Sequence, residues 1–443
     1  MHAMNENMKM VVSAPALSSP PVLSGRIVEA RGVIVRVVGA SLRIGEMVRF
    51  VRPDTLEEQI GEVVGFVQDG ALVMPLDGLA GLSNITQVEG CGLNWRRVDA
   101  LALLGRVIDG LGRPLDGGAV PEASTRQHPG VLSHINPLER PVISKPFVTG
   151  VRAIDGLLSC GIGQRVGIFA PAGGGKSTLM GMIANGATVD VIVVALIGER
   201  GREVAEFIHD HLGRRRESSV LIASTSERPA AERIKAAELA CSVAAELRAA
   251  GKQVLLLFDS LTRYARALRE VGLAVGEPPV RRGYPPRVFA ELPKLIESAG
   301  LTPRGAVTAF FTVLAEDEEM SDPVSEEARS LLDGHIQLSG SLGAAGHYPA
   351  IDVLNSKSRV MTRVTRSLHR DDASTVRGLV SRYQEVKLLL QIGEYRRGND
   401  RASDLAIDRH EMIERFLRQR HDEYSDWEST LASLHALCRG SGR

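Results

Sequence analysis

One stretch of the sequence combines the residue types that hold a nucleoside triphosphate. Residues 165–180 read Arg-Val-Gly-Ile-Phe-Ala-Pro-Ala-Gly-Gly-Gly-Lys-Ser-Thr-Leu-Met. Glycines lack a β-carbon, so the backbone can curl and point successive N–H groups at phosphates, at the positive end of a helix dipole. Lys176 adds a mobile cation, and Ser177 adds a hydroxyl ligand for Mg²⁺. The stretch predicts a phosphate-binding loop (P-loop), although the pattern GxxxxGK[ST] begins with Gly and this chain has Ala170 there; a plain glycine-rich turn is the alternative.

Two acidic residues follow other apolar runs. Asp259 ends the run at residues 254–259, the arrangement that holds Mg²⁺ through water beside a P-loop. Glu199 follows Val191–Ile197, where a carboxylate can orient the attacking water in line with the γ-phosphate, and Arg200 can neutralise phosphate charge. The ordinary alternatives are a helix cap for Asp259 and a solvated helix start for Glu199 and Arg200.

Composition narrows the class of protein. The chain has 443 residues, which suggests about three domains. Its 53 Lys and Arg equal its 53 Asp and Glu, which argues against a mainly electrostatic nucleic-acid binder. Four scattered cysteines form no CxxC pair, and no apolar run approaches the length of a membrane span. We therefore expect a soluble, cytosolic protein with reduced thiols.

The first part of the chain predicts a tail and a barrel. Residues 1–22 are expected to form a flexible or partner-binding tail. Residues 23–98 alternate short β-rich runs with glycine and proline turns, which predicts a small closed β-barrel. The expected strands are residues 25–30, 32–38, 47–51, 60–67 and 71–74.

The remainder predicts an α/β domain followed by helices. Within residues 99–365, a lead-in segment precedes apolar strands that alternate with helices, which predicts a parallel sheet covered on both faces. Ligands of such sheets bind at the carboxyl ends of the strands. Residues 366–443 are expected to form a small helical bundle. The expected strands are 165–170, 189–197, 220–224, 253–259 and 306–314, and the expected helices are 177–185, 202–212, 230–250, 260–271, 373–392 and 403–428.

Taken together, the motifs resemble the type III secretion ATPases, which comprise injectisome and flagellar export enzymes and are related to the catalytic subunits of rotary ATP synthases. The resemblance runs from about residue 24 almost to the end of the chain. The wording of the P-loop is closer to the injectisome branch, with flagellar export as the alternative. The family implies a RecA-like ATPase core between a β-barrel and a helical domain. The motifs are the P-loop, Gly-Glu-Arg-Gly-Arg-Glu at 198–203, Phe-Asp-Ser-Leu-Thr-Arg-Tyr at 258–264, Gly-Glu-Pro-Pro at 276–279 and Gly-Tyr-Pro-Pro at 283–286.

The resemblance also implies roles for particular residues. Glu199 would activate water, with Arg200 and Glu203 near the phosphates and the metal. Tyr348 matches an aromatic residue that stacks on adenine, although packing at a strand end is the alternative. Arg359 matches an arginine that the neighbouring subunit inserts into the site; alone, an arginine in a loop is more often solvated. The implied catalytic set is Lys176, Glu199, Arg200 and Arg359, the nucleotide set is Ala172, Gly173, Gly174, Gly175, Lys176, Ser177, Thr178 and Tyr348, and the metal set is Ser177, Asp259 and Glu203.

The implied function is Mg²⁺-dependent ATP hydrolysis by a homohexameric ring that energises type III secretion, releases chaperones and unfolds effectors for export. The implied partners are a central stalk, a stator, chaperone–effector complexes and an export gate, with the ring in the cytoplasm at the inner membrane. A hexameric nucleic-acid translocase is the rival from another class, but neutral charge and 4% aromatic residues disfavour it. A non-catalytic subunit is a second rival, which Glu199 opposes.

Overall fold

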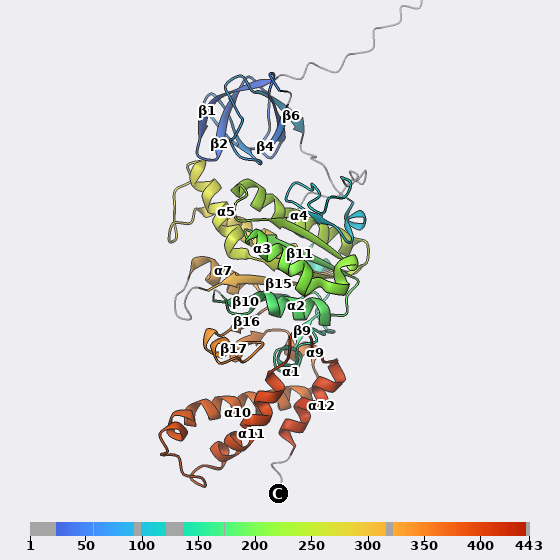
Figure 1. Cartoon of the computed structure of the whole chain (residues 1–443), viewed down its shortest axis with the longest axis vertical. Coiled ribbons are helices and arrows are strands. Elements are labelled where there is room, and N and C mark those ends of the chain that lie inside the picture. Colours follow the sequence, from blue (N-terminus) through green and yellow to red (C-terminus); the bar gives the residue numbers. More distant parts are fainter. Residues whose placement is uncertain are drawn as a thin grey trace, which may run out of the picture. The chain divides into compact units, whose positions relative to one another are not determined.

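The computed structural model describes residues 24–55, 57–92, 99–120, 136–171, 173–315 and 322–439. The chain divides into two compact units, Met1–Trp95 and Arg96–Arg443 (Figure 1). The predicted tail at residues 1–22 lies outside the described residues. The domain boundaries predicted at residues 98 and 365 stay predictions.

The first unit contains a closed antiparallel barrel with the strand order β1-β2-β5-β4-β3-β6. Alternate side chains of these strands are buried, and Val35, Val48, Phe50 and Val73 fill the interior. The predicted barrel and its first five strands are therefore confirmed. The strands are β1 (Gly25–Arg31), β2 (Ile34–Val38), β3 (Met47–Val51), β4 (Glu58–Val67), β5 (Gly70–Pro75) and β6 (Gln87–Gly92).

The sixth strand, β6, closes the barrel by pairing with both β1 and β3. The sequence did not predict this strand, because Gln-Val-Glu-Gly-Cys-Gly contains two glycines and only one side chain, Val88, that is buried. Such a strand has weak intrinsic β-propensity. It is held by the backbone groups of its two neighbours.

The second unit is built on a mainly parallel sheet in the order β17-β16-β10-β15-β13-β11-β12-β7. The parallel sheet predicted from continuous apolar runs is confirmed; every residue of β11 is buried. The lead-in segment supplies the short edge strand β7, which pairs in parallel with β12. The strands are β7 (Val107–Ile108), β10 (Arg165–Ala170), β11 (Val191–Ile197), β12 (Ser219–Ser224), β13 (Gln253–Asp259), β15 (Ala306–Leu314), β16 (Gly334–Leu338) and β17 (Ile351–Ser358), with β14 (Gly300–Leu301) beside β15 and a separate pair β8 (Pro146–Phe147) and β9 (Cys160–Gly161).

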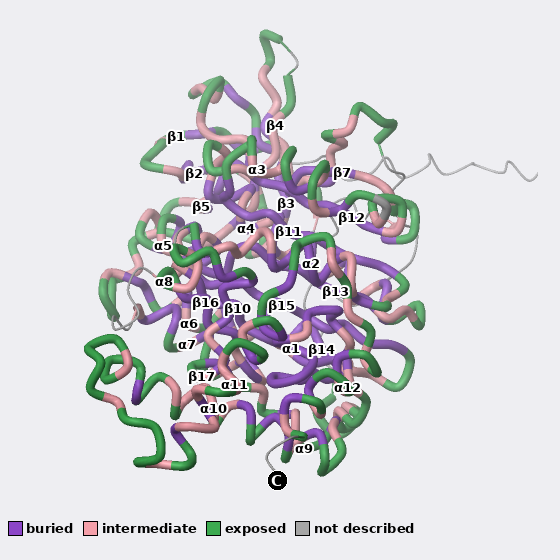
Figure 2. The backbone as a smooth tube through the Cα atoms, turned by 60° about the horizontal axis from the view of Figure 1, so that its bottom comes forward, coloured by how far each residue is buried: buried purple, intermediate pink, exposed green. Residues whose placement is uncertain are grey.

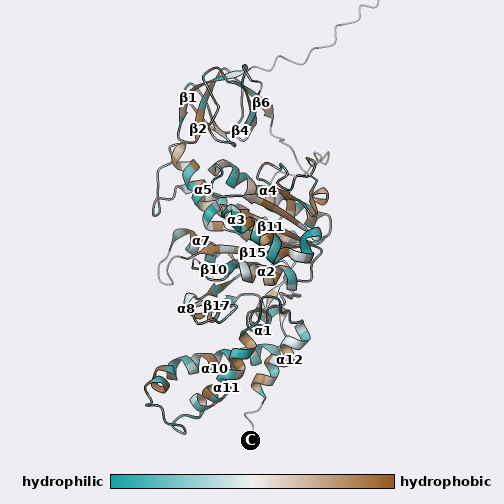
Figure 3. Ribbon diagram, in the orientation of Figure 1, coloured by the Kyte–Doolittle hydropathy of each residue, from teal (hydrophilic) through white to brown (hydrophobic). Residues whose placement is uncertain are grey.

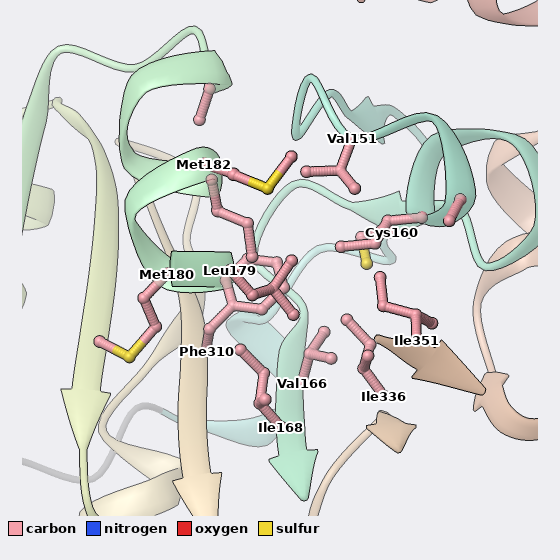
Figure 4. Close-up of a cluster of buried hydrophobic side chains, with 14 of the residues drawn as sticks. Val151, Cys160, Val166, Ile168, Leu179, Met180, Met182, Phe310, Ile336 and Ile351 are labelled. Atoms are coloured by element: carbon pink, nitrogen blue, oxygen red, sulfur yellow. The ribbon is translucent and has the colours of Figure 1, made fainter. Parts of the chain in front are cut away.

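Helices cover the sheet on both faces, and the central strands are buried (purple in Figure 2). On one face, Leu179 of helix α2 packs with Val166 and Ile168 of β10 (Figure 4). On the other face, Phe258 of β13 contacts Tyr264 of α5 edge to face. The helices of this layer are α2 (Lys176–Gly186), α3 (Gly201–Glu206), α4 (Ala230–Ala249), α5 (Leu261–Ala274), α6 (Pro286–Glu297), α7 (Pro323–Leu331) and α8 (Gly340–Ala344), with a π-helical segment η3 (Phe207–Leu212) and the 3₁₀ segments η1 (Ala100–Leu103), η2 (Pro137–Glu139) and η4 (Gly213–Ser218).

The end of the chain forms helices that mix hydrophilic and hydrophobic residues along their length, in contrast to the apolar strands (Figure 3). Helices α10 and α11 lie side by side, and Tyr383 stacks on His410 between them with ring centroids 3.5 Å apart. Both pack against α1, which precedes the P-loop strand in sequence. Among the described residues, none of the helices has the length and apolar character that crossing a bilayer requires. The helices are α1 (Arg152–Leu157), α9 (Met361–Val364), α10 (Ser367–Gln391), α11 (Arg401–Leu417) and α12 (Trp427–Cys438).

One predicted helix is wrong in its extent. The helix expected at residues 403–428 ends at Leu417, and a new helix begins only at Trp427. Arg418 has an extended backbone conformation, which ends the helix. Gln419 is buried, and its side-chain amide forms hydrogen bonds with the Gly150 carbonyl and the Arg152 amide at the start of α1. Tertiary hydrogen bonds therefore override the helical propensity of this segment.

The last residue of α2, Gly186, lies against the backbone of Thr149, so that a β-carbon there would stand 2.3 Å from the Thr149 carbonyl oxygen. We expect Gly186→Ala to lower the free energy of unfolding by about 1–3 kcal/mol, because backbone cannot give way as a flexible side chain can. The matched control is Gly378→Ala in α10, where nothing lies within 4 Å. That change should instead raise stability by about 0.5–1 kcal/mol. Urea unfolding of both variants checks this, and equal effects would contradict it.

Candidate active site

The glycine-rich loop joins β10 to α2 in the conformation that a phosphate cradle needs. Gly173 and Gly175 have φ of 74° and 81°, which side chains with a β-carbon rarely adopt. The Gly174 amide donates to the Pro171 carbonyl at 3.1 Å, closing the turn. Gly175 is the N-cap of α2, and no side chain caps the helix. The first backbone N–H groups of α2 can therefore donate hydrogen bonds to an anion. The predicted Ala172 lies outside the described residues.

Lys176 lies between two carboxylates. Its Nζ is 2.6 Å from Asp259 Oδ1 and 3.4 Å from Glu199 Oε1. Burial opposes the charged amine, but both carboxylates outweigh that effect and the pKa of Lys176 is raised. Burial also raises the pKa of Asp259, and Lys176 counteracts it. The structure thus brings together three of the residues that sequence reasoning selected.

Sheet topology explains this convergence. Glu199 follows β11, Asp259 ends β13 and Lys176 follows β10, and these parallel strands point their carboxyl ends to one edge. Glu199 is 5% exposed, so its carboxylate is shielded from bulk water. A carboxylate that follows a buried strand is positioned by the strand's neighbours and has little freedom to move.

The oxygen donors at this edge suit Mg²⁺. Ser177 follows Lys176 in the first turn of α2, and Asp259 also accepts a 2.7 Å hydrogen bond from Thr312 Oγ1 of β15. Nowhere in the described part of the chain do three or more His, Cys, Asp or Glu side chains gather to hold a metal ion. Mg²⁺ that arrives with a nucleotide takes one or two protein oxygens besides phosphate and water. Ser177 and Asp259 offer oxygens of this kind, and their role as metal ligands stays a prediction. Thr178, also in the first turn of α2, is half-buried.

Arg200 and Glu203 have no described side-chain contact with the cluster of Lys176, Glu199 and Asp259. They start α3 and pair with each other at 3.9 Å, with 77% of the Arg200 side chain exposed. Among the described contacts, none joins either residue to Lys176. Their predicted roles near phosphate and metal therefore stay predictions.

Two residues that sequence reasoning did not select also reach the site. The Nε atom of Arg263, in the first turn of α5, is 3.9 Å from Glu199 Oε1 and has no hydrogen-bond partner among the described residues. Thr312 fixes the Asp259 carboxylate, as described above. Arg263 was visible in the motif at residues 258–264, but an arginine four positions after Asp259 has no signature of its own. Thr312 lies within a buried strand and carries no sequence signal.

Tyr348 lies beside the P-loop. A β-carbon built on Gly175 would stand 3.6 Å from Tyr348 Cε1, and the tyrosine is 46% exposed. Its ring is therefore next to the phosphate cradle with a free surface that a flat base could cover.

Arg359 lies at the end of the sheet opposite to the P-loop, where the parallel strands begin. It follows β17, which runs antiparallel to β16, and its amide donates to the Asp333 carbonyl at 2.9 Å. Asp333 pairs with Arg165 at the start of β10, whereas the P-loop follows the end of that strand. The six residues of β10 span about 20 Å. The arginine cannot serve the P-loop of its own chain.

Comparisons with known proteins place the chain in a family. Residues 150–358 match the ATP synthase alpha/beta family, nucleotide-binding domain, and residues 365–436 match the T3SS EscN ATPase C-terminal domain. The chain is 50% identical to the type 3 secretion system ATPase of Xanthomonas euvesicatoria, over 93% of both chains. It is 48% identical to that of Sinorhizobium fredii, over 94% of this chain and 92% of the relative. Identity to the flagellum-specific ATP synthase of Pseudomonas aeruginosa is 43%, over 96% of both.

Solved structures agree. The assembled ATPase EscN of the enteropathogenic E. coli type III secretion system superposes with a TM-score of 0.87 at 45% identity, covering 93% of this chain and 99% of EscN. EscN in complex with its central stalk EscO gives a TM-score of 0.85 at 44% identity, covering 93% and 99%. The predicted fold, with a β-barrel, a RecA-like core and C-terminal helices in that order along the sequence, is thereby confirmed, and flagellar export stays the alternative. The chain belongs to the family of type 3 secretion system ATPases, and it is an ATPase that energises type III secretion.

Proposed function

We propose that this protein hydrolyses Mg²⁺–ATP at the edge of the sheet where Lys176, Glu199 and Asp259 meet. The cluster of one lysine with two buried carboxylates at the P-loop carries the proposal. When ATP binds, Lys176 moves from the carboxylates to the β- and γ-phosphates, as the cation of a phosphate cradle does. Glu199 is then free to accept the proton of a water aligned with the γ-phosphate.

Magnesium would be held by Ser177 and, through water, by Asp259. A bound Mg²⁺ would supply positive charge that offsets the charge developing on the phosphates. Thr312 keeps the Asp259 carboxylate oriented. Arg263 can take part of the phosphate charge from its position next to Glu199, with Arg200 and Glu203 at the solvent side.

The position of Arg359 supports a ring of several subunits. Because this arginine lies at the far edge of its own sheet, any role in hydrolysis requires the site of a second copy. We propose a homohexamer in which Arg359 of one subunit completes the site of its neighbour. Assembly of EscN and its complex with the central stalk EscO support a ring with a stalk partner.

The remaining partners come from the family resemblance. We propose that the ring works in the cytoplasm at the inner-membrane face of the apparatus, together with a stator, chaperone–effector complexes and the export gate. Hydrolysis there would release chaperones and unfold effectors for export.

The direct test is hydrolysis against protein concentration. Specific activity should rise steeply across the range in which mass photometry shows hexamers forming, and chelation of Mg²⁺ by EDTA should abolish it. A specific activity that is constant across the assembly transition would refute the shared site. Undiminished hydrolysis in EDTA would refute the metal role.

A further inference from the structure

Gln419, in the segment between α11 and α12, forms hydrogen bonds to two loops: the one that carries Tyr348 and the one at Gly150. Its backbone amide donates to the Tyr348 carbonyl at 2.9 Å. Its side-chain Nε2 donates to the carbonyls of Gly150 and Glu423, each at 2.7 Å. Its Oε1 accepts from the Arg152 amide at 2.8 Å. Gln419 is 4% exposed, so each of these bonds is made away from water.

The loop at Gly150 connects this residue to the P-loop helix. Gly150 has φ of 76°, and a β-carbon on it would stand 2.8 Å from the Cα of Gly186, the last residue of α2. The buried Asp155 fixes the same loop by accepting from the amides of Thr149 and Gly150 at 2.9 Å. Gln419 is therefore tied to a rigid contact at one end of α2, whose other end forms the phosphate cradle.

A second bond holds the Tyr348 loop from α11. His347 Nδ1 is 3.0 Å from Glu414 Oε2, and His347 is buried whereas Glu414 is half-buried. The hydrogen bond from His347 contributes most to a lowered pKa of Glu414. Glu414 and Gln419 thus form hydrogen bonds with two consecutive residues, His347 and Tyr348, in the loop that places the tyrosine next to Gly175.

We propose that Gln419, assisted by Glu414, is a positioning residue for the base of the bound nucleotide. It holds Tyr348 at a set distance from the P-loop, so that the C-terminal helices tune affinity for the base without touching the phosphates. This inference rests on the proposed function, and it requires in addition that Tyr348 stacks on the base of the bound nucleotide. It assigns Gln419 no contact with the reacting atoms.

The test is Gln419→Glu in the full chain. The change keeps the Oε1 acceptor but turns Nε2 into an oxygen that faces two carbonyl oxygens, which leaves buried groups unsatisfied. The dissociation constant for ADP and the KM for ATP should rise about tenfold, with kcat within about twofold. The dissociation constant for tripolyphosphate, which has no base, should stay unchanged. Calorimetry measures ADP and tripolyphosphate, and steady-state hydrolysis gives the KM and kcat.

Three further variants make the result decisive. Gln391→Glu makes the same change at the exposed end of α10 and should leave all constants unchanged. In a Tyr348→Ala background, Gln419→Glu should have little further effect on ADP, because its action passes through the tyrosine. If Gln419→Glu does not fold, Glu414→Gln takes its place, because a half-buried site tolerates this change. It should raise the dissociation constant for ADP about two- to threefold.

The outcomes separate this inference from the proposed function. A wild-type protein without Mg²⁺-dependent hydrolysis would remove the proposed function itself. An active wild type whose ADP affinity is unaffected by both Gln419→Glu and Glu414→Gln would overturn the positioning role alone. Equal losses for ADP and tripolyphosphate would also overturn it, since they would mean general loosening of the site.

Discussion

Glu199→Gln is expected to lower kcat for ATP hydrolysis by about 10²–10⁴-fold while ATP still binds. The side chain is 5% exposed at the carboxyl end of β11, and glutamine fills the same space. An amide can still accept a hydrogen bond from water, but it cannot take the proton. Because the change removes a negative charge 3.4 Å from Lys176 Nζ, the lysine is released more easily to the phosphates, and the variant should bind ATP as tightly as the wild type or tighter.

The matched control is Glu206→Gln on α3, a half-exposed carboxylate paired with Arg202. It should hydrolyse ATP at the wild-type rate. Single-turnover hydrolysis and binding of ATP, measured on hexamers of each variant, decide the matter. Wild-type kcat in Glu199→Gln would end its assignment as the base, and loss of ATP binding would show that it serves the fold of the site instead.

Arg359→Ala is expected to lower hydrolysis by about 10³-fold or more, because a trans arginine stabilises the charge that develops on the phosphoryl group. The guanidinium bonds to the Arg329 carbonyl at 3.1 Å and the side chain is exposed, so its loss should leave the subunit folded. An equal mixture with Glu199→Gln should recover about a quarter of wild-type activity, since one interface in four joins an intact Glu199 to an intact Arg359 in a randomly mixed ring.

Arg363→Ala, an exposed arginine on the neighbouring helix α9, is the control and should remain active. Mixed hexamers must be verified by native mass spectrometry of differently tagged subunits. If such rings form and hydrolyse no faster than either parent, Arg359 does not complete a neighbour's site.

Local pattern was enough for most of the architecture. Strands β10, β13 and β15 begin and end at the predicted residues, because a strand buried on both faces consists mainly of apolar residues. Pattern failed where neighbours decide the structure. The strand β6 is held by its two partners in the barrel, β7 contributes two residues to a sheet edge, and α11 ends where Gln419 becomes bonded to distant backbone.

The residues of the site likewise fall into those with a local sequence signature and those that only long-range contacts place there. Lys176, Ser177, Glu199 and Asp259 are predicted from the sequence alone, because a P-loop and strand-end carboxylates have short-range signatures that reflect the chemistry of phosphate and magnesium. Gln419 has no such signature, since its importance comes from bonds to Tyr348 and to the Gly150 loop across more than 70 residues of sequence. The antiparallel direction of β17 likewise removes Arg359 from its own P-loop. Contacts between residues far apart in the chain exist only once the sheet and helices have packed, and no local pattern encodes them.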